Sequence, residues 1–129
     1  MDVRMWTYEQ ATGNIYHDGE YIGTGYSGLD DGKNNPDMQE VQGVGPIPPR
    51  GQYSIGAAED NEKLGPHVMP LVPQPQTETF GRSGFFIHGD DIQHPGEGSH
   101  GCIVLARQLR EQISASGDAA LSVGVVRGE

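Results

Sequence analysis

The residues best suited to chemistry lie between positions 85 and 105, in the run FFIHGDDIQHPGEGSHGCIVL. This run contains the only cysteine of the chain, Cys102, and three of its five histidines, His88, His94 and His100. A single cysteine cannot close a disulfide within the chain. A thiol at the end of a glycine-rich loop, with imidazoles nearby, has the composition of a cysteine nucleophile. Only the thiolate attacks well, and a neighbouring imidazolium lowers a thiol pKa to about 3.5–7.5.

Two short apolar runs flank these residues and are expected to position them. Phe85-Phe86-Ile87 leads into His88, and Ile103-Val104-Leu105 follows Cys102. If the two runs form neighbouring strands, the imidazole of His88 lies against the sulfur of Cys102. His100 lies two residues before Cys102 and shares its face only if that segment is extended. From the spacing alone, both histidines are candidates for the base.

An acyl-transfer site also needs donors for the oxyanion that develops during attack. We expect backbone N–H groups at His100, Gly101 and Cys102 to supply them, and loss of one such donor typically costs about 2.7–4 kcal/mol of barrier. The backbone carbonyl of Gly89 is the expected partner of the base, because it can hold one tautomer of the ring. A guanidinium binds a carboxylate through two parallel hydrogen bonds, so Arg82 is either a substrate-binding residue or a surface arginine.

The composition limits the fold and the partners. At 129 residues the chain is expected to form a single domain, residues 1–129. A formal net charge of −10 argues against nucleic acid and anionic membranes as partners. The chain shows no N-terminal apolar stretch and no run long enough to span a bilayer. We therefore expect a soluble protein, made in the cytoplasm without a signal peptide of its own.

The residue pattern predicts a mostly β fold, a twisted β-sandwich or open barrel with one short C-terminal helix. Hydrophobic residues make up only 34% of the chain, and 20 glycines and 9 prolines favour short strands and turns. Strands are expected over residues 5–8, 15–17, 21–22, 52–56, 68–72 and 121–126, with a loop over 28–49. Leu105, Leu109 and Ile113 mark one face of a helix over 106–114. Trp6 and Tyr8 are expected in the core, and His17 on the surface without a role in the site.

The order of the motif residues resembles the signature of the YkuD-type L,D-transpeptidases, enzymes of peptidoglycan. That signature is a histidine, a gap, and Ser/Thr-His-Gly-Cys, here His88-Gly89 and Ser99-His100-Gly101-Cys102-Ile103. The resemblance implies that His88 is the general base and Cys102 the nucleophile, that His100 and Gly101 shape the oxyanion region, and that Ser99 lies on the substrate side of the loop. The gap is shorter than in the common branch, and Val104 stands where the family often has Asn or Arg. The run Pro-x-Gly-x-Tyr-x-Ile at 49–55 resembles a scaffold segment of the same family.

Five segments in order are similar to a subgroup whose small domains serve as antibacterial effectors of type VI secretion: WTYEQATG, GKNNPDMQ, GPIPPRG, FGRSGFFIHGD and SHGCI. The resemblance implies L,D-transpeptidase or L,D-carboxypeptidase action on tetrapeptide stems of peptidoglycan, without a cofactor or metal. It implies secretion into the periplasm of a target bacterium. It also implies an immunity protein and a secretion-apparatus protein as partners.

Other interpretations fit parts of the pattern. Three histidines and a cysteine suggest zinc, but neither the C-x-x-C nor the H-E-x-x-H spacing is present. Papain-like proteases carry their histidine far after the cysteine. Asp30, Asp31 and Asp37 do not match the spacing of an EF-hand. A β domain that binds peptidoglycan or peptides without turnover, with an inert buried cysteine, remains as the alternative. Thiol labelling separates it from an enzyme.

Overall fold

A computed structural model describes residues 5–126, and most of its regular elements are strands. In chain order they are β1 (Trp6–Glu9), β2 (Asn14–His17), β3 (Glu20–Thr24), β4 (Tyr26–Ser27), the 3₁₀ turns η1 (Asp30–Gly32) and η2 (Pro36–Met38), β5 (Gly51–Ile55), β6 (Glu59–Asn61), β7 (Gly65–Pro73), β8 (Phe85–His88), β9 (Ile103–Val104), α1 (Arg107–Ser116) and β10 (Ala120–Gly124). The prediction of a mostly β fold with one short helix is confirmed. The ends of the predicted domain, residues 1–4 and 127–129, lie outside the described residues.

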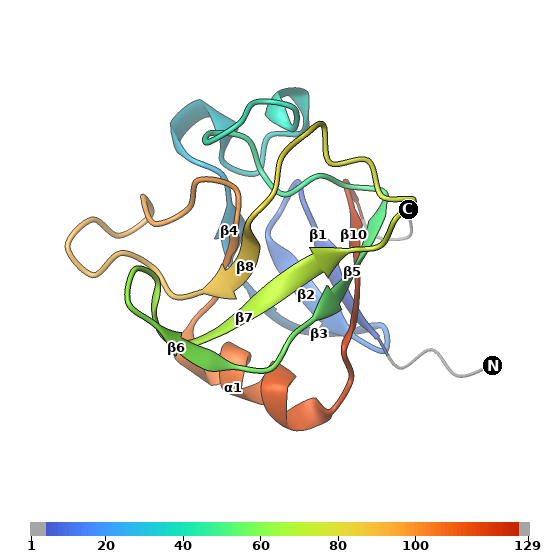
Figure 1. Cartoon of the computed structure of the whole chain (residues 1–129), viewed down its shortest axis with the longest axis vertical. Coiled ribbons are helices and arrows are strands. Elements are labelled where there is room, and N and C mark those ends of the chain that lie inside the picture. The colour runs from blue at the N-terminus through green and yellow to red at the C-terminus, as the bar shows by residue number, and fades with distance from the viewer. Residues whose placement is uncertain (1–4, 127–129) are drawn as a thin grey trace.

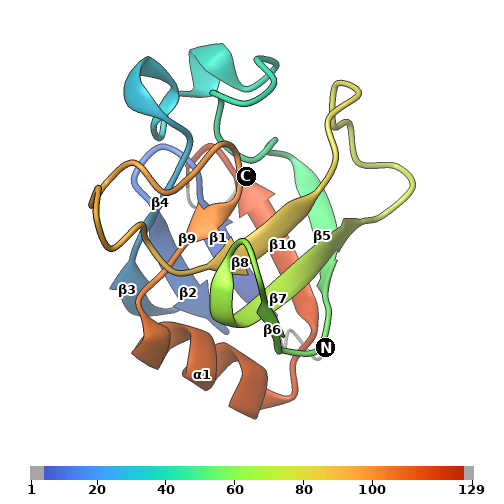
Figure 2. The same cartoon turned by 60° about the vertical axis from the view of Figure 1, so that its left-hand side comes forward.

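The strands form one curved sheet that nearly closes on itself, with the order β3-β2-β1-β10-β5-β7-β8-β9-β4. Its two edge strands, β3 and β4, are consecutive in the chain and separated only by Gly25. A Cβ at Gly25 would lie 1.9 Å from the Val104 carbonyl oxygen, so a glycine is needed where the edges approach. The strands surround a common core, with α1 across one end (Figures 1 and 2).

The core consists of the inward side chains of the strands and one face of α1. Trp6 and Tyr8 are 1% and 0% exposed, as expected from the sequence. Leu105 and Ile113 are buried and Leu109 packs against them, which confirms the predicted helix face. Within residues 5–126, no helix is long and apolar enough to cross a bilayer.

Strand β7 is the element that the sequence predicted least well. It has nine residues in place of the expected five and contains Pro66, Pro70 and Pro73. Pro70 has no N–H to donate, but it still contributes an acceptor to the sheet between β5 and β8. Its carbonyl oxygen accepts a hydrogen bond from Gly56 N–H at 2.8 Å. The short strands β4 and β6 were not predicted either. The helix ends at Gly117, whose φ of 76° is the left-handed cap that glycine favours.

Strands β8 and β9 run side by side, the arrangement that the sequence analysis considered for His88 and Cys102; their parallel direction was not predicted. Their register pairs Ile87 with Ile103 and His88 with Val104. One residue earlier in this register, Cys102 lies opposite Phe86. The fold therefore brings the histidine strand and the segment that carries the cysteine into direct contact.

Candidate active site

The register places His88 and Cys102 on the same side of the sheet. Ile87 and Ile103 point into the core and are both fully buried. Side chains alternate along a strand, so the flanking His88 and Cys102 point away from that core. Cys102 is opposite Phe86, two residues before His88. By this alternation the two side chains are expected on one face of the sheet, two positions apart in the register.

The imidazole of His88 is held by the backbone of the next residue. Its Nδ1 lies 2.7 Å from the Gly89 carbonyl oxygen, which is the hydrogen bond expected from the sequence. Because a carbonyl only accepts, Nδ1 carries the proton and Nε2 is the basic nitrogen. Burial lowers the pKa of His88, the Gly89 carbonyl raises it, and the charge of Arg110 lowers it again; the net shift is downward. His88 is therefore neutral near pH 7, the state that a general base requires.

Cys102 is partly buried, and its thiol donates a hydrogen bond to the Gly84 carbonyl oxygen at 3.5 Å. Burial raises the pKa of the Cys102 thiol above its ordinary value, although Phe86 N–H and the charge of Arg82 oppose the shift. This corrects the expectation that an imidazolium lowers the thiol pKa. Loss of hydration disfavours both charged forms, so the resting pair is a neutral thiol and a neutral imidazole.

Ser99 organises the loop from inside. It is 0% exposed, and its hydroxyl donates to the Cys102 carbonyl at 2.6 Å and accepts from Gly28 N–H at 2.9 Å and Gly101 N–H at 3.1 Å. The substrate contact expected of Ser99 is thus replaced by a role inside the protein. The Gly101 N–H, expected to face an oxyanion, points into the loop. The N–H groups of His100 and Cys102 remain the predicted oxyanion donors.

Arg82 is 6% exposed, so the interpretation of a surface arginine is wrong. Its Nη1 donates to the carbonyls of Gln39 at 2.5 Å and Pro46 at 2.8 Å, and its Nη2 donates to that of Gly45 at 2.9 Å. The guanidinium therefore fixes the segment 39–46 beside the cysteine, and its positive charge favours the thiolate of Cys102. Carboxylate binding by Arg82 stays a prediction.

Two clefts open on either side of His100. A cleft of about 230 Å³ is lined by Cys102, Arg82 and their neighbours. A second cleft of about 500 Å³ is lined by His88, the loop that follows it and the β6–β7 turn. His100 lines both clefts and is itself exposed, with its Nδ1 3.1 Å from the Gly43 carbonyl oxygen. Figure 1 shows the loop, in orange, projecting beside the green β6–β7 turn.

The loop between base and nucleophile is folded around Asp90. Tyr26 donates its hydroxyl hydrogen to Asp90 Oδ1, and Gly96 N–H donates to Oδ2 at 2.9 Å. Gly98 N–H in turn donates to the Tyr26 oxygen at 2.8 Å. Burial raises the pKa of Asp90, but these hydrogen bonds outweigh it and the net shift is downward. Asp90 is therefore a structural residue of the loop.

Arg110 is the site residue that the sequence analysis missed. It is 6% exposed and donates to the carbonyls of Leu105 at 3.0 Å, Pro66 at 2.7 Å and His67 at 2.9 Å. A Cβ placed on Gly89 would lie 2.8 Å from Arg110 Nη2. The guanidinium therefore packs directly behind Gly89, the residue whose carbonyl holds the His88 ring. The available signal was its spacing: Arg110 lies three residues before the buried Ile113, on the inner face of the helix.

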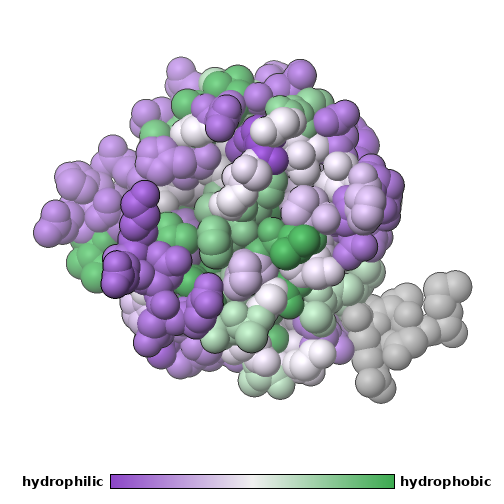
Figure 3. All heavy atoms as spheres, viewed as in Figure 1, coloured by the Kyte–Doolittle hydropathy of each residue, from purple (hydrophilic) through white to green (hydrophobic). Residues whose placement is uncertain are grey.

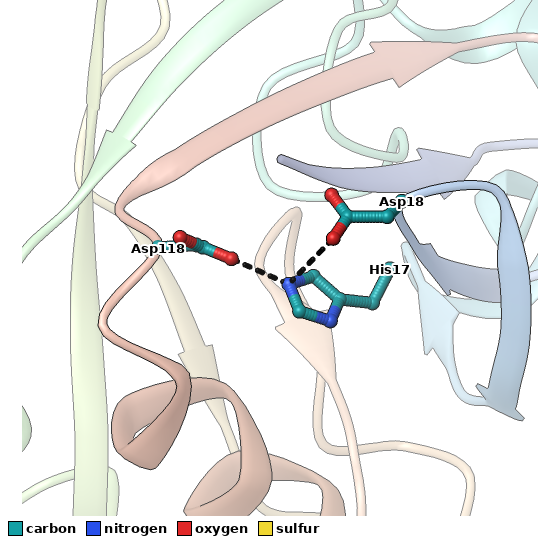
Figure 4. A group of neighbouring side chains, drawn as sticks. All are labelled: His17, Asp18 and Asp118. Carbon is teal, nitrogen blue, oxygen red and sulfur yellow. Dashed lines mark hydrogen bonds and ion pairs between the residues drawn. The ribbon is translucent and has the colours of Figure 1, made fainter. Parts of the chain in front are cut away.

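A second group of titratable side chains joins β2 to the turn before β10 (Figure 4). His17 Nε2 lies 2.6 Å from Asp118 Oδ2 and 3.8 Å from Asp18 Oδ2. The His17 ring stacks on Trp6 with 4.2 Å between centroids, and its side chain is 26% exposed. The expectation of a surface histidine is therefore wrong. Its hydrogen bond to Asp118 is a structural link between two distant segments.

The three histidines of the motif do not gather around one point. His94 lies in the outer loop with a side chain 63% exposed, 3.6 Å from Asp91. Among residues 5–126, the group of His17, Asp18 and Asp118 meets the geometric condition for a metal site, and the motif histidines with Cys102 do not.

Comparison with known families identifies the type of domain. The family model of the Tlde1 domain, a type VI secretion effector domain, matches residues 22–126. The matched range contains both clefts, the loop, and the motif residues from His88 to Ile103, whereas the segment WTYEQATG at residues 6–13 precedes it. No curated protein matches the chain.

Proposed function

Because this chain belongs to the Tlde1 domain family of type VI secretion effectors, we propose that it is an antibacterial effector that cuts or exchanges peptidoglycan stem peptides in the periplasm of a target cell. The activity is that of an L,D-transpeptidase or L,D-carboxypeptidase on tetrapeptide stems. An immunity protein and a protein of the secretion apparatus are its further partners. The observation that carries the proposal is the register of the parallel strands β8 and β9, which sets His88 two positions from Cys102, with each residue lining an open cleft.

In the first half-reaction, Cys102 turns from the Gly84 carbonyl toward His88, whose Nε2 takes the thiol proton. The sulfur attacks the carbonyl that joins the L-centre of diaminopimelate to the terminal D-Ala. The N–H groups of His100 and Cys102 face the oxyanion. The C–N bond then breaks, and His88 returns the proton to the amine of the departing D-Ala. A thioester on Cys102 remains.

The second half-reaction resolves the thioester. Water or an amine attacks the carbonyl carbon, His88 takes a proton from the attacking group, and the C–S bond breaks with return of a proton to sulfur. Water gives a shortened stem, and an amine gives a crosslink or an exchanged D-amino acid. Because burial lowers the pKa of His88, the base stays competent below the ordinary histidine value of 6.5, and the acid limb of kcat/KM is expected below that pH.

The test is incubation with purified tetrapeptide muropeptides, with and without a free D-amino acid, followed by mass analysis. The wild-type protein is expected to release D-Ala, and Cys102→Ala and His88→Ala to release none. His94→Ala is the matched control, because it removes an exposed loop histidine, and it is expected to keep wild-type release. D-Ala release by Cys102→Ala would remove the nucleophile and with it the proposal.

The alternative of a peptide-binding domain without turnover has one observation in its favour. Burial raises the pKa of Cys102, and its thiol is bonded to Gly84. Labelling with iodoacetamide separates the two functions. An enzyme is expected to lose all turnover on stoichiometric alkylation of Cys102, and a binder to have no turnover to lose.

A further inference from the structure

The guanidinium of Arg110 is a buried positive charge whose partners, within residues 5–126, are backbone carbonyls and not carboxylates. The side chain is 6% exposed; its Nε donates to Leu105 at 3.0 Å, and its Nη1 donates to Pro66 at 2.7 Å and His67 at 2.9 Å. A charge taken out of water is costly unless it is well paired. The surface over the nearby loop and the β6–β7 turn is largely hydrophilic (Figure 3), so solvent was open to this cation and its burial calls for a reason.

Arg110 contacts both groups that fix the position of His88. The His88 carbonyl accepts from Leu105 N–H at 3.0 Å, and the Leu105 carbonyl accepts from Arg110 Nε. Leu105 thus links the guanidinium to the backbone of the base. On the other side, a Cβ on Gly89 would lie 2.8 Å from Arg110 Nη2, so Gly89 packs against the guanidinium. The carbonyl of Gly89 is the group that holds the His88 ring.

The same guanidinium holds the start of β7, next to the wall of the His88 cleft. His67 has a φ of 53°, which is uncommon for a residue with a side chain, and Nη1 of Arg110 binds the two carbonyls at this point. His67 Nε2 also lies 2.8 Å from Ser114 Oγ. Ser114 follows Arg110 by one helical turn and lies on the same face of α1. The helix therefore fixes the segment that directly follows the cleft-lining residues 62–65.

We propose that Arg110 is a positioning residue for the base His88. It holds the backbone around that ring through Leu105 and Gly89, and it holds the cleft wall at a fixed distance from the ring through the two carbonyls at the start of β7. The inference rests on the proposed function, since His88 is the base of that reaction. Arg110 lines neither cleft; it acts by keeping the Gly89 carbonyl at Nδ1, so that Nε2 stays the basic nitrogen.

The first test compares two substitutions of Arg110 with a control on the same helix. Arg110→Gln removes the charge, and Arg110→Lys keeps the charge but lacks the planar group that serves three carbonyls at once. A misplacement of about 1 Å can cost about 100-fold in rate, so we expect kcat for D-Ala release to fall at least about tenfold in Arg110→Gln and less in Arg110→Lys. The acid limb of kcat/KM is expected to move to higher pH in Arg110→Gln alone, because this charge lowers the pKa of His88. Arg107→Gln, at a position 53% exposed, is expected to match the wild type.

Gly89→Ala tests the contact from the other side, with Arg110 intact. Gly89 has no positive φ, so its backbone accepts an alanine. The added Cβ would meet a guanidinium that cannot swing away without losing its carbonyls. We expect Gly89→Ala to lower kcat by displacing the carbonyl that holds His88, and the narrower side chain of Arg110→Lys to relieve the crowding. The kcat loss of the double variant is therefore expected to be at least about threefold smaller than the product of the single losses.

The tautomer of His88 can be read without substrate, so this measurement is independent of the proposed reaction. Long-range ¹H–¹⁵N spectra at pH 8 are expected to show the proton on Nδ1 in the wild type and in Arg107→Gln. A mixture of both tautomers is expected in Arg110→Gln and in Gly89→Ala. A purely structural role would lower the stability of Arg110→Gln and leave the tautomer and the acid limb unchanged.

The wild-type tautomer and kcat in folded Arg110→Gln, or single losses that simply multiply in the double variant, would overturn the positioning role. If Arg110→Gln does not fold, Gly89→Ala decides, and an unchanged tautomer there overturns the role. A tautomer that depends on Arg110 in a protein that releases no D-Ala would keep the positioning of the ring and remove the proposed reaction. Release of D-Ala with a tautomer and kcat indifferent to Arg110 would keep the reaction and remove the role.

Discussion

Replacing Ser99 with alanine tests how the nucleophile loop is held. Ser99 is fully buried, and its hydroxyl serves three backbone groups: the Cys102 carbonyl, Gly28 N–H and Gly101 N–H. The substitution removes one oxygen and leaves all three groups without that partner. A buried polar group left unpaired costs about 1–3 kcal/mol. Because the loop can relax toward solvent, we expect the low end for each, about 3 kcal/mol of unfolding free energy in total.

The assay has two readings. Urea denaturation gives the loss of stability, and the melting temperature is expected to fall by roughly 10 °C, on the order of 4 °C per kcal/mol for a domain of this size. The rate of iodoacetamide alkylation reports the loop itself. A loosened loop exposes the sulfur of Cys102, so the rate measured under native conditions is expected to rise several-fold.

Ser83→Ala is the matched control, because Ser83 is exposed and lines the same cleft as Cys102. It is expected to change stability by less than about 0.5 kcal/mol. If Ser99→Ala is as stable as this control and its thiol reacts at the wild-type rate, the hydroxyl does not organise the loop. Direct substrate contact by Ser99 would then have to be considered again.

Three further expectations concern titration. Burial raises the pKa of the Cys102 thiol, so the alkylation rate is expected to have its midpoint above the value of a free thiol, about 8.5; a midpoint below it would show that the resting pair is ionised after all. Arg110→Gln removes a positive charge that lowers the pKa of His88, so NMR titration is expected to give a higher His88 pKa in this variant. The controls Arg110→Lys and Arg107→Gln, the latter at an exposed position, are expected to keep the His88 pKa near the wild-type value. An unchanged His88 pKa in Arg110→Gln would refute the coupling. Hydrogen bonds hold the pKa of Asp90 below its ordinary 3.8 in the folded state. The stabilising contribution of Asp90 is therefore present above pH 3.8 and is lost as the pH falls through the lower pKa of the folded state. NMR signals of the backbone amides of residues 96 and 98 that stay unchanged from pH 6 to pH 2 would contradict this.

The local pattern was enough to predict much of the frame. The alternation around Trp6 and Tyr8, and the four-residue spacing from Leu105 to Ile113, follow from one buried face of a strand or a helix. The two apolar runs that flank the loop suggested that β8 and β9 are neighbours, but their parallel direction was not predicted. These features depend on residues near one another in the chain, or on one short connection.

The features that could not be predicted depend on long-range contacts. β7 extends through three prolines because β5 and β8 flank it, and no local pattern encodes those neighbours. Ser99 was assigned to the substrate by resemblance, and Arg82 was considered for a substrate carboxylate because a guanidinium matches a carboxylate. Arg82 binds carbonyls 36 to 43 positions away, and Ser99 accepts from Gly28 N–H, 71 positions away. Only the closed sheet brings these groups together.

The negative net charge of the chain does not predict the electrostatics of the candidate active site, because two arginines are buried next to it. The chain has 18 acids and only 8 lysines and arginines, yet Arg82 and Arg110 are both buried, one beside Cys102 and one behind His88. Arg82 favours the thiolate, and Arg110 keeps the imidazole from holding a proton. Their charges act in opposite directions on a thiolate–imidazolium pair, while burial disfavours that pair as a whole. The proton is therefore expected to leave the sulfur only as the carbonyl is attacked, and a solvent isotope effect on the release of D-Ala is the measurement that checks this order.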